Sequence, residues 1–411
     1  MQTFNVLKYS TQYYLDLEEK YSAHNYHPLP VVLSRGQGVF VWDVEDKRYY
    51  DFLSGYSAVN QGHCHPAIVR TLVEQAQQLT LTSRAFHSNV LGEYSKYITG
   101  LFKYDKVLPM NTGVEAVETA IKLARHWGYL VKKIKDQQAK IIVCEGNFHG
   151  RTSAVISFSS DPTAKDNFGP YMPGFIQIPY NDLDALEQAL QDETVAGFLV
   201  EPIQGEAGVV VPCEGYLDRA YQMCKRSNVL FMADEIQTGL SRTGRMLACD
   251  HENVQPDILI LGKALSGGCL PISAVLANNE IMLTIKPGEH GSTYGGNPLA
   301  CKVAIAAMEV LQNEHLSVNA ATMGDYFRNE LRALDNPYIQ LVRGKGLLNA
   351  MIIKHDRPDA AWDLCLELKN NGLLAKPTHG DKIRLAPPLT ISREQIDDCI
   401  EIIRKSLLIL A

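Results

Sequence analysis

The chain has 411 residues, of which 46% are hydrophobic and 21% are charged, and its formal net charge at pH 7 is −7. This is the composition of an ordinary globular protein, and the length is sufficient for two domains. The acidic balance gives no electrostatic reason to expect binding to nucleic acid or to an anionic membrane, and the many apolar runs exclude a disordered chain.

The first part of the chain predicts a small hairpin. A tyrosine-rich opening reaches a proline break at residues 28–30, and a β-prone stretch follows at 39–43. After a turn at 45–47, the two tyrosines at 49–50 resume the β-prone pattern, as in a hairpin. We therefore assign residues 1–56 to an N-terminal segment.

The middle of the chain predicts an α/β domain. Short apolar runs alternate with helical segments, and such continuous runs are what strands buried on both faces of a parallel sheet require. Helices between the strands would give a layered α/β domain over residues 57–316. A small α+β domain, 317–411, would follow, with helices and short strands. The four apolar runs that end in a polar or glycine-containing turn are 141–144, 198–200, 229–233 and 258–261.

Two ionisable residues end buried strands, at the sheet edge where α/β proteins bind ligands. Lys263 follows one run and Asp234 ends another. A lysine there is costly unless it is paired or made covalent, and a Schiff base with an aldehyde cofactor meets that need. In enzymes that use pyridoxal phosphate (PLP), an acidic group keeps the pyridine nitrogen protonated. Taken singly, Lys263 could be an ion-pair partner and Asp234 a turn residue.

Two glycine-containing loops accompany this pair. Thr112 with Glu115 fits a capping box at the start of an amphipathic helix, which by itself explains the sequence. The free amides of Gly113 and Val114 could also bind a phosphate at this helix N-terminus. The glycine-rich segment 291–298 could be an ordinary loop. Together with the strand-end lysine and aspartate, the two loops predict a cofactor site.

The cysteines and the first residues bear on metal binding and location. The nine cysteines contain no CxxC pair, which is typical of reduced thiols. His63 and His65 flank Cys64, but no second ligand pair stands at a zinc-like spacing, so we expect no metal. The first residues resemble neither a signal peptide nor a transit peptide, and no apolar run reaches the length of a membrane span. We expect a cytoplasmic protein.

These motifs resemble the class III, fold type I, PLP-dependent aminotransferases. The likeness extends from about residue 26 to residue 389, and the stretches 234–239 and 262–265 are highly specific to that group. The resemblance implies a fold type I large domain with a smaller C-terminal domain. It also implies a homodimer whose active sites lie at the subunit interface.

The resemblance assigns a role to each cofactor residue. Lys263 would bind the cofactor and shuttle the proton, and Asp234 would pair with the pyridine nitrogen. Gln237 would contact the ring hydroxyl, and Phe148 would stack on the flat ring. Amide and hydroxyl donors would bind the phosphate, and these are Gly113, Val114 and, from the other subunit, Thr293.

Within the class, the substrate positions resemble those of enzymes that act on ornithine. Arg151 would bind a substrate carboxylate, and Tyr26 and Tyr56 would line the pocket for the α-amino end. Glu206 would pair with Arg384. The implied reaction moves the δ-amino group of L-ornithine to 2-oxoglutarate by a ping-pong mechanism. It gives L-glutamate and glutamate-5-semialdehyde, which cyclises to pyrroline-5-carboxylate.

The pairing of Glu206 with Arg384 suggests a switch between the two substrates. While Glu206 masks Arg384, ornithine could present its δ-amine, and with the pair open Arg384 could bind the α-carboxylate of 2-oxoglutarate through a bidentate fork. Alternatively, the two residues form a plain structural ion pair, and Tyr26 and Tyr56 pack at a subunit interface.

Three rival interpretations stay open. An N-acetylornithine aminotransferase would share the cofactor motifs, although Tyr56 and the segment around Tyr26 favour free ornithine, whose amino group needs polar partners. A class III aminomutase or racemase would use the same cofactor residues. A non-catalytic scaffold is the third, and the presence of both Lys263 and Asp234 argues against it.

Overall fold

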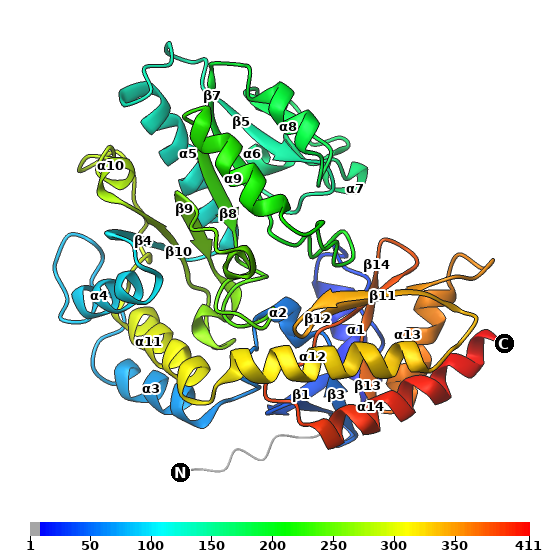
Figure 1. Ribbon diagram of the computed structural model, residues 1–411. Helices are drawn as coiled ribbons and strands as arrows, with labels where there is room; N and C mark the ends of the chain where they lie inside the picture. Colours follow the sequence, from blue (N-terminus) through cyan, green and yellow to red (C-terminus); the bar gives the residue numbers. More distant parts are fainter. Residues whose placement is uncertain (1–8) are drawn as a thin grey trace.

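The computed structural model describes residues 9–411, so residues 1–8 of the predicted N-terminal segment lie outside the described part. The described chain contains one seven-stranded sheet and two four-stranded sheets. Figure 1 shows the large sheet with its helices in the upper part of the molecule and the two smaller sheets in the lower part. In residues 9–411, no helix is long and apolar enough to cross a membrane.

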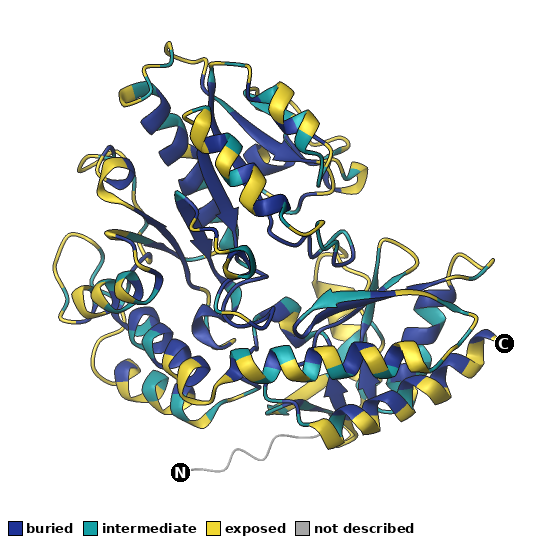
Figure 2. Ribbon diagram, in the orientation of Figure 1, coloured by how far each residue is buried: buried dark blue, intermediate teal, exposed yellow. Residues whose placement is uncertain are grey.

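The large sheet confirms the predicted, mostly parallel arrangement. Its strand order is β4-β10-β9-β8-β7-β5-β6, and β10 is antiparallel to both of its neighbours. Every residue of β7, β8, β9 and β10 is buried, which explains their continuous apolar runs; the dark strands in Figure 2 show this. The strands are β4 (Lys106–Met110), β5 (Lys140–Cys144), β6 (Phe175–Ile178), β7 (Val195–Val200), β8 (Leu230–Asp234), β9 (Ile258–Leu261) and β10 (Ser273–Ala277).

Helices cover both faces of this sheet. In β5, Ile141 and Val143 pack in one cluster with the apolar side of α5 (Gly113–Leu130), whereas Ile142 and Cys144 pack in another with α8 and α9. This alternation follows from the two-residue period of a strand. The other helices outside the C-terminal region are α1 (Thr11–Tyr21), α2 (Ser54–Ser57), α3 (Pro66–Ala76), α4 (Leu91–Phe102), α6 (Ser153–Ile156), α7 (Pro162–Lys165), α8 (Leu183–Ala189), α9 (Tyr216–Arg226), α10 (Asn279–Met282) and α11 (Pro298–Asn313).

The predicted hairpin is present and belongs to a larger sheet. β2 (Phe40–Asp43) and β3 (Arg48–Asp51) pair antiparallel, and β1 (Leu33–Gln37) joins them on one side. On the other side, β13 (Leu373–Leu374) pairs parallel with β3. The N-terminal segment therefore shares a sheet with the C-terminal region.

The remaining sheet belongs to the C-terminal region. It is antiparallel throughout, in the order β11-β12-β15-β14. Its strands are β11 (Ile339–Lys345), β12 (Leu348–Ile353), β14 (Lys376–Thr378) and β15 (Lys382–Leu385). The helices of this region are α12 (Leu316–Ala333), α13 (Ala360–Asn370) and α14 (Arg393–Ser406).

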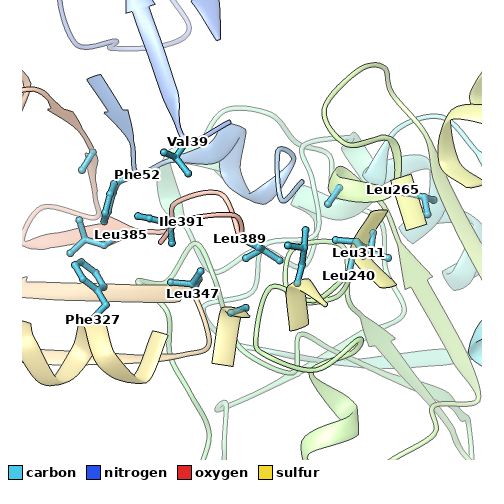
Figure 3. Close-up of a cluster of buried hydrophobic side chains, with 14 of the residues drawn as sticks. Val39, Phe52, Leu240, Leu265, Leu311, Phe327, Leu347, Leu385, Leu389 and Ile391 are labelled. Carbon is cyan, nitrogen blue, oxygen red and sulfur yellow. The ribbon is translucent and has the colours of Figure 1, made fainter. Parts of the chain in front are cut away.

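One hydrophobic cluster connects these parts. Figure 3 shows Phe52 of the N-terminal segment close to Phe327 of α12 and Leu385 of β15, with Leu240 and Leu265 of the middle region in the same cluster. The Phe52 and Phe327 rings lie 5.5 Å apart between centroids. Regions that the sequence assigns to three segments thus share one buried core.

Candidate active site

The carboxyl ends of β7, β8 and β9 meet beside a cavity of about 210 Å³. Every cofactor residue that the sequence predicts from the same chain lines this cavity. The full lining is Gly113, Val114, Phe148, His149, Gly150, Glu201, Glu206, Asp234, Ile236, Gln237 and Lys263.

Lys263 begins the short 3₁₀ turn that follows β9, and its φ of 41° lies in the left-handed region. Such a backbone is unfavourable for a residue with a side chain and is typical of functional sites. Burial lowers the pKa of Lys263, and the negative charge of Glu206 opposes only part of this effect. A lowered pKa increases the fraction of neutral amine, the form that attacks a carbonyl or accepts a proton.

Asp234, at the end of β8, has a histidine partner that the sequence interpretation missed. Nδ1 of His149 donates to Oδ2 of Asp234 at 2.7 Å, and both side chains are buried. Burial alone would lower the pKa of His149, but the hydrogen bond and charge of Asp234 raise it overall. His149 is thus a buried partner that holds the carboxylate of Asp234 beside the cavity.

Glu201 is a second residue that sequence reasoning missed. It follows β7 directly, as Asp234 ends β8, so its strand-end position was the available signal. Its carboxylate accepts from the backbone amides of Phe148 at 2.8 Å and Gly205 at 3.3 Å. Burial raises the pKa of Glu201 to about 7. Glu201 thereby connects the two loops that carry Phe148 and Glu206.

The predicted pairing of Glu206 with Arg384 is present. Nη1 of Arg384 lies 2.5 Å from Oε1 of Glu206, and the same oxygen accepts from Nε2 of Gln237 at 3.1 Å. The Arg384 guanidinium lies 4.9 Å from the ring centroid of Tyr56. Burial alone would raise the pKa of Glu206, but Arg384 lowers it below its ordinary value. Glu206 is therefore charged at neutral pH.

The other predicted residues lie outside the cavity of the single chain. The exposed Arg151 guanidinium lies 5.7 Å from the ring centroid of Phe148, beside the site. Tyr26 is 73% exposed. Thr293 is exposed in the loop before α11.

The donor set of the cavity fits PLP. The first amides of α5, at Gly113 and Val114, have no intrahelical acceptors and can bind a phosphate. In the described residues, Nε2 of His149 and Oε1 of Gln237 are buried without hydrogen-bond partners. Lys263 provides the amine for an aldehyde. These groups match a flat molecule with a phosphate, an aldehyde and polar ring substituents.

Gly205 permits a close approach between its own backbone and the side chain of Gln237, which lines the cavity. A Cβ atom added to Gly205 would lie 1.6 Å from Oε1 of Gln237. Any larger residue at this position would displace Gln237 and with it the hydrogen bond to Glu206.

Comparisons with known proteins show which family the chain belongs to. The mitochondrial ornithine aminotransferase of Rattus norvegicus is 63% identical over 399 residues, which cover 97% of this chain and 91% of that protein. An ornithine aminotransferase structure from Toxoplasma gondii, with PLP at partial occupancy in its active site, has a TM-score of 0.96 and 49% identity, covering 98% of this chain and 95% of that one. An acetylornithine aminotransferase structure from Elizabethkingia anophelis has a TM-score of 0.90 and 60% identity, covering 97% and 99%. Residues 21–407 match the family described as aminotransferase class-III. The chain therefore belongs to the class-III aminotransferases, which are PLP-dependent enzymes.

Proposed function

We propose that the protein transfers the δ-amino group of L-ornithine to 2-oxoglutarate. The products are L-glutamate and glutamate-5-semialdehyde, which cyclises to pyrroline-5-carboxylate. The observation that carries this proposal is the ion pair between Glu206 and Arg384. The Arg384 guanidinium lies against the ring of Tyr56, and Glu206 lines the cavity that contains Lys263. The names of the rat and Toxoplasma relatives support it.

Each cofactor residue has a task in this reaction. When bound, PLP supplies an aldehyde that takes up the amino group and a ring that accepts electrons. Lys263 holds the cofactor and moves the proton through its amine. Asp234 keeps the ring nitrogen protonated, and His149 fixes the orientation of Asp234 through the 2.7 Å hydrogen bond. Phe148 covers the ring, and the amides at the start of α5 bind the phosphate.

The substrate end must accept a cationic diamine in one half-reaction and a dicarboxylate in the other. With Glu206 paired to Arg384, the positive charge of Arg384 is neutralised, and Arg151 binds the ornithine carboxylate. When the pair opens, Arg384 binds the α-carboxylate of 2-oxoglutarate through two parallel hydrogen bonds. Tyr26 and Tyr56 line the pocket for the ornithine α-amino group.

The assembly and location belong to the same proposal. Two copies form a homodimer with active sites at the interface, where Thr293 of one subunit reaches the phosphate of the other. The exposure of Thr293 and of its neighbour Tyr294 in a single chain supports this arrangement. The protein acts in the cytoplasm, although the names of the rat and Drosophila melanogaster relatives place those proteins in mitochondria.

One alternative function, the transamination of N-acetylornithine, has support from one solved structure. The Elizabethkingia structure, at 60% identity, is described as an acetylornithine aminotransferase. Tyr56 and the charged pair next to it favour free ornithine, because an α-amino group requires polar partners that an acetamide does not.

A half-reaction without oxo acid tests the proposal. The PLP-loaded protein is mixed with L-ornithine or with N-acetylornithine, and Lys263→Ala serves as the control that cannot turn over. We expect ornithine to bleach the visible cofactor absorbance and to yield pyrroline-5-carboxylate. A response to N-acetylornithine alone would establish the rival. A protein that takes up no PLP would overturn the assignment of the cavity.

A further inference from the structure

Arg242 is a fully buried arginine outside the cavity, with a relative exposure of 0%. In the described residues, Arg242 forms no ion pair, and the charge of Asp51 offsets only part of the cost of burying the guanidinium. Burial lowers the pKa of Arg242 to about 9, so the guanidinium is still protonated at neutral pH. Because burying this guanidinium costs free energy, we expect Arg242 to have a specific role.

Neutral acceptors from three separate segments surround the guanidinium. Nε and Nη2 donate to Oδ1 of Asn60 at 3.1 and 2.6 Å. Nη1 donates to the carbonyls of Leu347 at 3.0 Å and Pro387 at 2.6 Å. The side-chain amide of Asn60 in turn donates through Nδ2 to the carbonyl of Leu240 at 2.8 Å. One side chain thus joins the segment near residue 60, the β11–β12 turn and the segment after β15.

These segments carry the residues of the substrate end. Asn60 follows Tyr56 within one short stretch, and Pro387 is separated by Ala386 from the end of β15, which contains Arg384. Arg242 itself lies in the loop that continues from Gln237.

We propose that Arg242 is a positioning residue that sets the relative placement of Tyr56, Gln237 and Arg384, and thereby the affinity for the dicarboxylate substrate. This inference rests on the proposed function, because that function gives these residues their substrate role. A planar fork with donors in several directions can satisfy the acceptors at once, whereas a lysine ammonium at the same point cannot reach all of them.

Arg328 of α12 is a matched control. It is also a buried arginine, and its Nη1 donates to the carbonyl of Gly346 in the same β11–β12 turn at 2.6 Å and to Oδ1 of Asn349 at 2.7 Å. In the described residues, its hydrogen bonds do not reach the segments near Asn60 or Pro387. A general loss of packing around this turn would therefore affect both variants, but a loss of positioning would affect only Arg242.

The experiment compares R242K and R328K in the PLP-loaded enzyme. It measures thermal stability, cofactor absorbance, kcat, the KM for 2-oxoglutarate and the Kd of glutarate, a non-reacting dicarboxylate. For R242K, we expect KM and Kd to rise about tenfold, the effect of roughly one misplaced charged hydrogen bond, with the cofactor absorbance intact and kcat changed less than KM. For R328K, we expect both constants to stay within about twofold of the wild type even where stability falls, because the substrate residues keep their placement.

The possible outcomes are decisive. Unchanged constants in R242K, or an equal rise in R328K, would overturn the proposal. If R242K does not fold, Asn60→Ala removes the acceptor of two of the hydrogen bonds and keeps the arginine; raised constants support the proposal and unchanged ones overturn it. The oxo-acid measurement works with any amino donor that the wild type accepts. Failure of the ornithine half-reaction is therefore distinguishable from failure of this inference.

Discussion

Two acidic residues at neighbouring strand ends of the site differ in their surroundings. The carboxylate of Asp234 accepts a hydrogen bond from the side chain of His149, whereas in the described residues the carboxylate of Glu201 accepts from the backbone amides of Phe148 and Gly205. Burial therefore dominates at Glu201 and raises its pKa to about 7. The neutral form of Glu201 is favoured in the folded protein over the pH range below that value.

This difference predicts the pH dependence of stability. Between about 4.5, the ordinary pKa of a glutamate, and about 7, the folded protein binds more protons at Glu201 than the unfolded chain does. The stabilising contribution is therefore fully present below this window and is lost as pH rises through it. Glu201→Gln should flatten the curve of unfolding free energy against pH by a few kcal/mol across the window, as measured by urea denaturation. Equal slopes in variant and wild type would contradict the assignment.

Glu206 offers a test of the substrate switch. Glu206→Ala removes the carboxylate that neutralises Arg384, so Arg384 becomes free to bind α-carboxylates in both half-reactions. We expect the single-turnover rate with glutamate, relative to that with ornithine, to increase by about tenfold or more. Glu206→Gln, which can keep the hydrogen bonds without the charge, should give an intermediate ratio. A ratio equal to that of the wild type in both variants would show a plain structural ion pair.

At the scale of elements, the buried strands and the capped helix were predictable from sequence. The apolar runs of β5, β7, β8 and β9 cannot alternate because both faces are covered, and Thr112 with Glu115 marks the start of α5 locally. The antiparallel direction of β10 and its place between β4 and β9 were not predictable, because strand order depends on long-range packing.

Two of the residues that sequence reasoning missed were overlooked for the same reason. His149 and Arg242 lie in polar-looking loops, and only the folded chain shows that both are buried. Hydropathy predicts exposure for such residues, because charged side chains are rarely buried without partners. Their partners, Asp234 and Asn60, are distant in the sequence. The partnership therefore appears only in three dimensions.

The cap of α5 stabilises the helix and also lies beside the proposed phosphate site. The two roles can be measured separately. Thr112→Ala removes the acceptor of the Glu115 amide, and Ser392→Ala removes the equivalent cap of α14, which also has a capping box. Each change should lower the unfolding free energy by about 1 kcal/mol. Of the two changes, we expect Thr112→Ala alone to weaken PLP binding, because the first residues of α5 line the cavity and those of α14 do not. Reconstitution of apoenzyme with PLP measures the affinity, and an equal effect of both variants would contradict a phosphate role for α5.

At the scale of the whole molecule, the proposed dimer predicts complementation between subunits. In that dimer, Lys263 would act in its own chain, and Thr293 would act in the site of the partner. Thr293→Ala should weaken PLP binding, and Lys263→Ala should abolish turnover. In a mixed dimer, one site combines an intact Lys263 with an intact Thr293, so activity at limiting PLP should exceed the average of the separate samples. Sedimentation should give the mass of two chains, and activity equal to the average would place Thr293 outside the shared site.

The parallel pairing of β3 with β13 has a consequence for synthesis on the ribosome. Tyr50 lies opposite Leu373, so the first sheet of the chain cannot be completed until nearly all of the protein has been made. Synthesis proceeds at roughly 5–20 residues per second, so the edge of β3 stays unpaired for tens of seconds before β13 is made. An open strand edge during this interval is a template for pairing with other nascent chains. Efficient production of the protein therefore depends on what shields residues 48–51 before the last strands emerge.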